Sequence, residues 1–167
     1  MVAFTLEKVS AFMGSLLSTD AFDSYGVHEI TIMKGFNLII EGNQGAVLES
    51  GTSSAETEEQ VAAAPGPVLY GTVRPLCFDA VKGKVLPEFM RFVLTAPAGT
   101  LKRLTAESGG PVDETNILSL ALNITYRNGA ITVTSGTSAK DIFAGKAVDT
   151  VWGEAVKRLF TPFGLVE

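Results

Sequence analysis

The chain has 167 residues and a formal net charge of −5, with 13 Lys and Arg against 18 Asp and Glu. This length suits one folding unit, so we expect residues 1–167 to form a single domain. The acidic balance argues against a general nucleic-acid binder, because nucleic-acid binding relies on Lys and Arg to neutralise phosphates. The alternative is a nucleic-acid contact through a local basic patch.

Hydropathy and cysteine content bear on the partners of the protein and on its cellular location. Charged residues make up 19% of the chain and the mean hydropathy is +0.28, which is high for a soluble monomer. We therefore expect a homo-oligomer or a protein partner to cover part of the apolar surface. The chain has one cysteine and its first residues show no secretory signal, which favours a cytoplasmic protein. No apolar stretch reaches membrane-spanning length, so we expect no membrane contact.

The N-terminal part predicts a helix and a hairpin. From Leu6 to Leu17, apolar residues recur every three or four positions, as on one stripe of a helix, with Thr5 as the candidate N-cap. Residues 27–33 and 36–42 are rich in β-branched side chains, with Lys34 and Gly35 between them as a tight turn. This pattern predicts a β-hairpin.

Residues 49–67 are small, polar and acidic, with few large apolar side chains to offset the entropy lost on ordering. We expect them to form a mobile acidic loop within the domain. Its simplest interpretation is a tolerated surface insertion, and the alternative is an acidic interaction segment.

A second helix is predicted from Thr72, its candidate cap, to Lys82, with Pro75 in its first turn. Residues 88–95 and 100–106 are predicted to be strands. The chain then alternates apolar and polar side chains on both sides of Asn128 and Gly129, the favoured pair for a type I′ turn.

With that turn, Tyr126 should face Ile131 and Ile124 should face Val133 across the hairpin. Residues 139–144 are predicted to add one more strand, and a closing helix is marked by apolar residues from Val148 to Leu159. The order predicts an α+β fold: an antiparallel sheet with about three helices packed on one face, and the other face open to water or a partner.

Cys77 is the one residue that resembles a reactive nucleophile, since Arg74 and Lys82 are nearby in sequence. In a helix, however, Cys77 shares an apolar stripe with Val73, Leu76 and other small apolar residues. We therefore interpret it as a core residue with a raised pKa.

His28 is the only histidine, so any histidine-based catalytic site must use it. Alternation with Ile30 and Ile32 predicts a hydrogen-bonded residue at the margin of the core; the alternative is a catalytic base oriented by Asp20 or Asp23. With one Cys and one His, the usual structural zinc sites are excluded, and the motifs of phosphate-binding loops are missing. We expect neither metal nor cofactor.

Arg74, Lys82 and Lys84 form the candidate binding site for an anion or an acidic partner. Arg74 and Lys82 are eight residues apart, which places them on one face of a helix. The alternative interpretation is an ordinary solvated surface.

Residues 70–84, 122–143 and 149–160 resemble a bacterial family known only as a domain of unknown function, and the resemblance extends over nearly the whole chain. It implies an intracellular bacterial protein and carries no activity, substrate or catalytic residue. The order of strand (residues 2–6), helix, hairpin, loop, helix and meander is similar to one domain of a bacterial sliding DNA clamp. Clamps line their ring with basic helices, whereas the first helix here offers only Lys8.

The function expected first is a non-catalytic binding or scaffold domain that acts through its surface and self-associates. The first alternative is a small hydrolase-type enzyme that uses His28 with carboxylates brought close by folding. The second is a clamp-like, DNA-associated protein, which would require a continuous basic stripe on one helical face.

Overall fold

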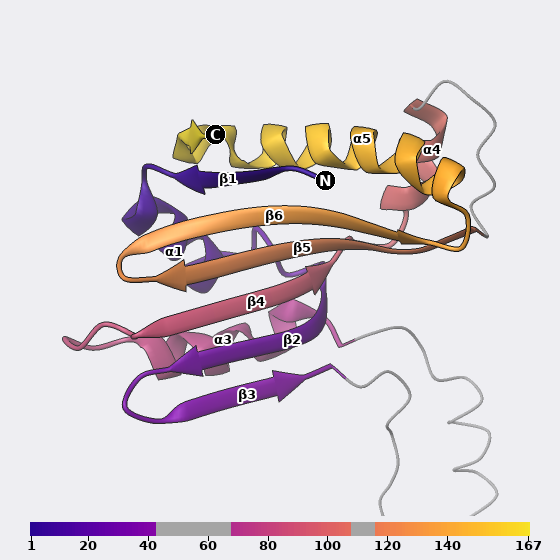
Figure 1. Cartoon of the computed structure of the whole chain (residues 1–167). Helices are drawn as coiled ribbons and strands as arrows, with labels where there is room; N and C mark the ends of the chain where they lie inside the picture. Colours follow the sequence, from indigo (N-terminus) through magenta and orange to yellow (C-terminus); the bar gives the residue numbers. More distant parts are fainter. Residues whose placement is uncertain (43–67, 108–115) are drawn as a thin grey trace, which may run out of the picture.

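The computed structural model describes residues 1–42, 68–107 and 116–167, and within them lie seven strands and four α-helices (Figure 1). The strands are β1 (Ala3–Leu6), β2 (Gly26–Met33), β3 (Asn37–Glu41), β4 (Phe89–Thr95), β5 (Ile117–Arg127), β6 (Ala130–Ala139) and β7 (Leu165–Val166). The helices are α1 (Val9–Ser18), α3 (Tyr70–Val81), α4 (Thr100–Glu107) and α5 (Ile142–Phe160), and a short 3-10 helix, η2 (Thr161–Phe163), follows α5. The acidic loop predicted at residues 49–67 lies outside the described residues.

The strands form one sheet in the order β3-β2-β4-β5-β6-β1-β7, and every neighbouring pair is antiparallel. The predicted α+β class is therefore confirmed. β3 forms one edge of the sheet, as Figure 1 shows. The two-residue β7 forms the other edge. No helix in the described parts of the chain is long and apolar enough to cross a membrane.

The register places the core on one face of the sheet. Ile30, Phe92, Ile124 and Val133 lie opposite one another across four adjacent strands, and all four are buried. Because side chains alternate along a strand, their sequence neighbours form the other face of the sheet. A representative row there is polar: Thr31, Arg91, Thr125 and Thr132.

The helices contribute to the same buried cluster as this inner face. α1 and α5 meet where the rings of Phe12 and Phe160 lie 5.3 Å apart. α3 is tied to α1 by the buried hydroxyl of Tyr70, which donates a hydrogen bond of 3.0 Å to the carbonyl oxygen of Leu16. This polar tie is satisfied inside an apolar cluster, and it fixes the position of α3 against α1.

Two predicted strands are wrong. Residues 100–106 form helix α4, in which Leu101 and Leu104 stand three positions apart and turn to one side. Residues 139–144 contain the end of β6 and the start of α5. The helix begins there because the Asp141 side chain accepts a hydrogen bond from the backbone N–H of Phe143, as an N-cap residue does.

Two predicted helix starts are also wrong. Thr5 is a residue of β1, the strand expected at residues 2–6, and α1 begins only at Val9. α3 begins at Tyr70, and the backbone N–H of this first residue donates to the carbonyl oxygen of Tyr25. Because the helix starts there, Thr72 is not its cap and Pro75 lies beyond its first turn.

Candidate functional site

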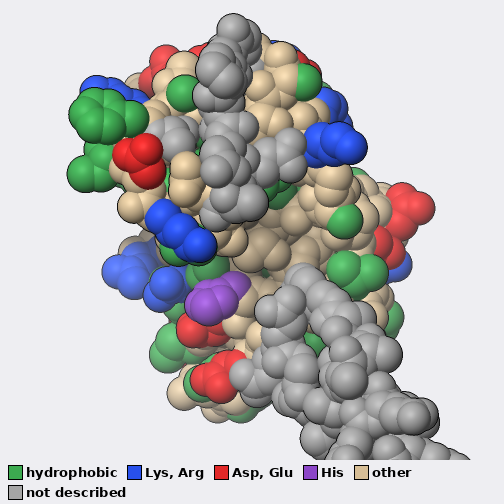
Figure 2. All heavy atoms as spheres, turned by 90° about the vertical axis from the view of Figure 1, so that its right-hand side faces the viewer, with side chains coloured by type: hydrophobic (Ala, Val, Ile, Leu, Met, Phe, Trp, Pro, Cys, Tyr) green, Lys and Arg blue, Asp and Glu red, His purple; other side chains and the backbone are tan. Residues whose placement is uncertain are grey.

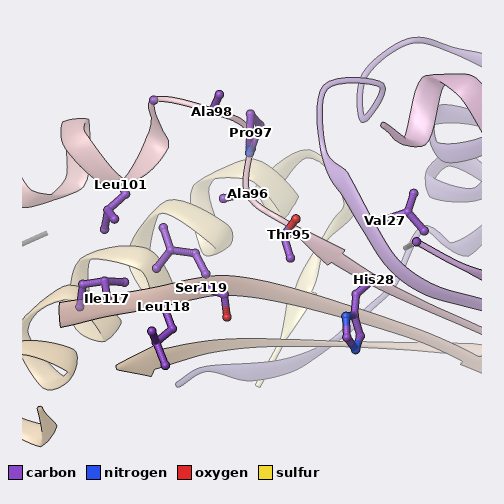
Figure 3. Close-up of a pocket in the computed structure, with 13 residues that line it drawn as sticks. Val27, His28, Thr95, Ala96, Pro97, Ala98, Leu101, Ile117, Leu118 and Ser119 are labelled. Atoms are coloured by element: carbon purple, nitrogen blue, oxygen red, sulfur yellow. The ribbon is translucent and has the colours of Figure 1, made fainter. Parts of the chain in front are cut away.

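One concavity lies where β2 begins, β4 ends and β5 begins, and we call it the end cavity. Its volume is about 390 Å³. Figure 3 shows His28 on one side, the start of β5 on the other, and the segment after β4 above. Most lining residues are apolar, and the polar side chains among them are His28, Thr95 and Ser119. The lining residues within the described part of the chain are Val27, His28, Gly42, Thr95, Ala96, Pro97, Ala98, Gly99, Leu101, Ile117, Leu118, Ser119 and Leu120.

Two β-bulges shape the end cavity. In β2, Val27 pairs with Leu94 and Glu29 pairs with Val93, so His28 between them has no partner on β4. In β5, the register to β6 shifts in the same way and leaves Leu118 as the extra residue. A bulge turns a side chain away from the direction that alternation would give it, and bulges are frequent beside binding sites.

The bulge overturns the expected position of His28. Val27 takes the inward place, Ile30 and Ile32 are fully buried, and His28 is exposed at the cavity instead of at the core margin. Among the described residues, no hydrogen bond to the imidazole is present. Asp23, one of the two carboxylates considered as its orienting partner, is bound to Arg74.

Three exposed apolar side chains lie at this end of the sheet, and of these Leu118 also lines the end cavity. Leu118 is 60% exposed, and Ile142 and Phe143 in the first turn of α5 are 83% and 84% exposed. The backbone bond from Lys140 N–H to the Asn116 carbonyl joins the two segments that carry them. Figure 2 views this end and shows exposed hydrophobic side chains, with the single histidine in purple at the surface. We call Leu118, Ile142 and Phe143 the apolar rim.

Cys77 is confirmed as a core residue. It is fully buried in α3, and burial raises the pKa of its thiol to about 12. Val73 and Val81 pack against the same core, whereas Leu76, expected on that stripe, is exposed.

The three residues of the predicted basic site, Arg74, Lys82 and Lys84, differ in their burial and in their partners. Arg74 is half-buried and holds Asp23 through two hydrogen bonds, of 2.7 Å from Nε and 3.1 Å from Nη2. The hydrogen bond to Asp23 raises the pKa of Arg74. Lys82 pairs with Asp79 on the exposed surface at 3.0 Å, and Lys84 is exposed in the loop beyond α3. Binding of an anion by these three residues stays a prediction.

Thr95, Ser119 and the apolar rim were not anticipated from the sequence. The bulges depend on pairing between strands distant in the chain, and nothing local marks them. The exposure of Ile142 and Phe143 did have a local signal, because Asp141 is a good N-cap residue and a helix starting there would begin with two apolar side chains.

No curated protein and no solved structure matches the chain, so the expected architectural likeness to a sliding-clamp domain gains no support from a structural neighbour. A family model does match, over residues 15–165, which is most of the chain. The chain belongs to the family of unknown function DUF5721.

Proposed function

We propose that this protein is a non-catalytic binding domain that holds an apolar side chain of a protein partner in the end cavity, with the apolar rim as the surrounding contact surface. The observation that carries the proposal is the combination of a mostly apolar hollow with three highly exposed apolar side chains at the same end of the sheet. Large exposed apolar side chains that gather in one region often mark interaction sites in soluble proteins.

The shape of the site favours an anchoring side chain. Interfaces obtain most of their energy from a few apolar anchors that fill pockets and are surrounded by contacts that exclude water. The cavity of about 390 Å³ would receive the anchor. Its three polar side chains, His28, Thr95 and Ser119, offer the few hydrogen bonds that fix the orientation of a bound group.

A DNA-binding role has less support. Helix α1 contains no Lys or Arg, and α3 contains only Arg74, whose guanidinium is occupied by Asp23. These helices therefore offer no continuous basic stripe of the kind that duplex binding needs.

A hydrolase is the second candidate, because His28 and the Ser119 hydroxyl line the same cavity. Strand β4 lies between β2 and β5, which separates their backbones by about 10 Å, two strand spacings. No carboxylate is among the described lining residues, so none of them would orient a base at His28. These facts favour binding over catalysis.

The binding proposal can be tested by NMR with N-acetyl-tryptophan amide and N-acetyl-leucine amide as probes of side-chain binding. We expect saturable shifts of the amide signals of residues 95–101 and 117–120, and we expect Leu118→Glu to abolish them. The control is Val166→Glu, another exposed apolar residue, in β7 at an edge of the sheet. Shifts that scatter over the surface, or an equal loss in both variants, would refute the proposal.

The hydrolase is tested with p-nitrophenyl acetate. A binding domain predicts slow ester cleavage that does not saturate with substrate, and His28→Ala should lower its rate by no more than the contribution of one free imidazole. Saturable turnover that disappears in His28→Ala would instead establish catalysis.

A further inference from the structure

Strand β3 is an edge strand whose outer side is unpaired among the described residues (Figure 1). Its sequence is Asn37–Glu41, NLIIE, and it carries neither Lys nor Pro, the residues that commonly protect an edge from pairing. Ile39 at its centre is 58% exposed. Glu41 is the one charged side chain in this strand, and an apolar edge with so little protection is prone to pair with a further strand.

The hydrogen bonds within the hairpin show which backbone groups of β3 are already used. Opposed residues in an antiparallel pair alternate between exchanging both bonds and exchanging none. The N–H of Gly42 donates to the carbonyl of His28, and the N–H of Lys34 donates to the carbonyl of Phe36. The even-numbered residues of β3 therefore bond to β2.

The odd-numbered residues, Asn37, Ile39 and Glu41, thus direct their N–H and C=O groups away from β2 toward the free edge. These groups are spaced as the hydrogen-bonding positions of a further antiparallel strand. Main-chain pairing at a free edge is a general mode of strand addition.

We infer that the free edge of β3 pairs with β3 of a second copy of this chain, antiparallel and centred on Ile39, so that two sheets join into one across a two-fold axis. In this register Ile39 lies opposite Ile39 of the partner subunit, and Asn37 lies opposite the partner's Glu41. Every outward-directed backbone group in the strand then has a partner, and no two carboxylates are opposed.

Side-chain directions agree with this register. Leu38 and Ile40 are half-buried and pack against the core on the inner face, and the pairing places Leu38 opposite the partner's Ile40. The apolar inner row thereby continues from one copy into the other. On the outer face, Ile39 contacts Ile39 of the partner subunit, and the pairing removes this exposed apolar side chain from water. A two-fold axis perpendicular to the sheet keeps the helices of both copies on one side.

Registers shifted by one pair use the edge less well. Centring on Leu38 would leave the outward groups of Glu41 without a partner in β3. Centring on Ile40 would leave those of Asn37 without one, and it would place Glu41 opposite the partner's Ile39. The register centred on Ile39 alone uses the whole strand.

Sedimentation equilibrium tests the association. We expect the full chain to sediment as a dimer at micromolar to millimolar concentration and Ile39→Lys to sediment as a monomer, because two lysines would be opposed at the axis. The matched control is Thr132→Lys on β6, an exposed residue of the same outer face away from the edge, which should remain dimeric. A monomeric wild type, or a dimeric Ile39→Lys, would overturn the inference.

Cysteine cross-linking tests the register. Hydrogen-bonded antiparallel pairs have Cα atoms about 5.5 Å apart, within the range that a disulfide spans. Ile39→Cys should therefore form a covalent dimer under mild oxidation, while Asn37→Cys, about 14 Å from its copy, should not. Equal cross-linking of the two variants would overturn the register. The buried Cys77 does not compete for oxidant.

Discussion

His28 of β2 and Leu118 of β5 are both the extra residue of a β-bulge, and the two bulges lie on either side of the end of β4. Each is an exposed side chain that regular alternation would have placed differently. Both line the end cavity. The candidate site is thus made by two local departures from the sheet register, while the remaining pairs of these strands stay regular and hold the inner face together.

The apolar rim should bind a hydrophobic dye in the folded state. We expect the double variant Ile142→Ser with Phe143→Ser to lower the fluorescence of anilinonaphthalene sulfonate bound to the native protein. Since both side chains are more than four-fifths exposed, unfolding free energy should change by no more than about 0.5 kcal/mol. Urea denaturation measures the second quantity. Unchanged fluorescence would show that the rim does not form a usable apolar surface.

Local patterns predicted much of the sheet. The hairpin of β5 and β6 has the expected register, with Tyr126 opposite Ile131 and Ile124 opposite Val133. This succeeded because strict alternation and an Asn-Gly turn fix the register from sequence alone. The hairpin of β2 and β3 was also predicted correctly.

The errors came where the deciding interaction is weak or non-local. Helix α4 is short, and its few apolar residues fit a strand as well as a helix. At His28, only the pairing with β4 reveals the bulge. Sequence could therefore place the strand that carries His28 but could not show that its side chain faces the end cavity.

Cys77 should be unreactive in the native protein. Its thiol is fully buried and its pKa is raised to about 12, so almost no thiolate exists at neutral pH. We expect no labelling by dithionitrobenzoate in buffer and stoichiometric labelling in denaturant. Rapid labelling in buffer would show that α3 opens readily, and it would reopen a chemical role for this residue.

The hydroxyl of Tyr70 should contribute to stability. Tyr70→Phe removes the 3.0 Å bond to Leu16 and leaves that carbonyl unpaired in a buried position. We expect the free energy of unfolding to fall by about 1–2 kcal/mol at neutral pH, measured by urea denaturation. The comparison is Tyr126→Phe, a buried tyrosine of β5, which should lose less. Equal losses would mean that the hydroxyl bond is not the cause.

The same buried groups make stability depend on alkaline pH. Burial raises the pKa of Tyr70 above 10.0 and that of Cys77 above 9.0, so the native state keeps both protons where the unfolded state releases them. The stabilisation from Cys77 is complete below pH 9 and that from Tyr70 is complete below pH 10. Above these values each contribution is lost by about 1.4 kcal/mol per pH unit. We expect Cys77→Ala to lessen this slope between pH 9 and 12, and an unchanged slope would contradict the assignment.

The turn between β5 and β6 requires a glycine. Asn128 and Gly129 have φ angles of 52° and 79°, as a type I′ turn demands. Gly129→Ala forces a side chain into the left-handed region, and we expect a loss of about 1 kcal/mol in the free energy of unfolding. The matched control is Gly136→Ala in β6, where an added Cβ meets nothing within 4 Å. That variant should be neutral or slightly stabilising, because alanine reduces the entropy of the unfolded chain. If urea denaturation shows equal losses for the two variants, backbone strain in the left-handed region is not the reason that the turn requires glycine at position 129.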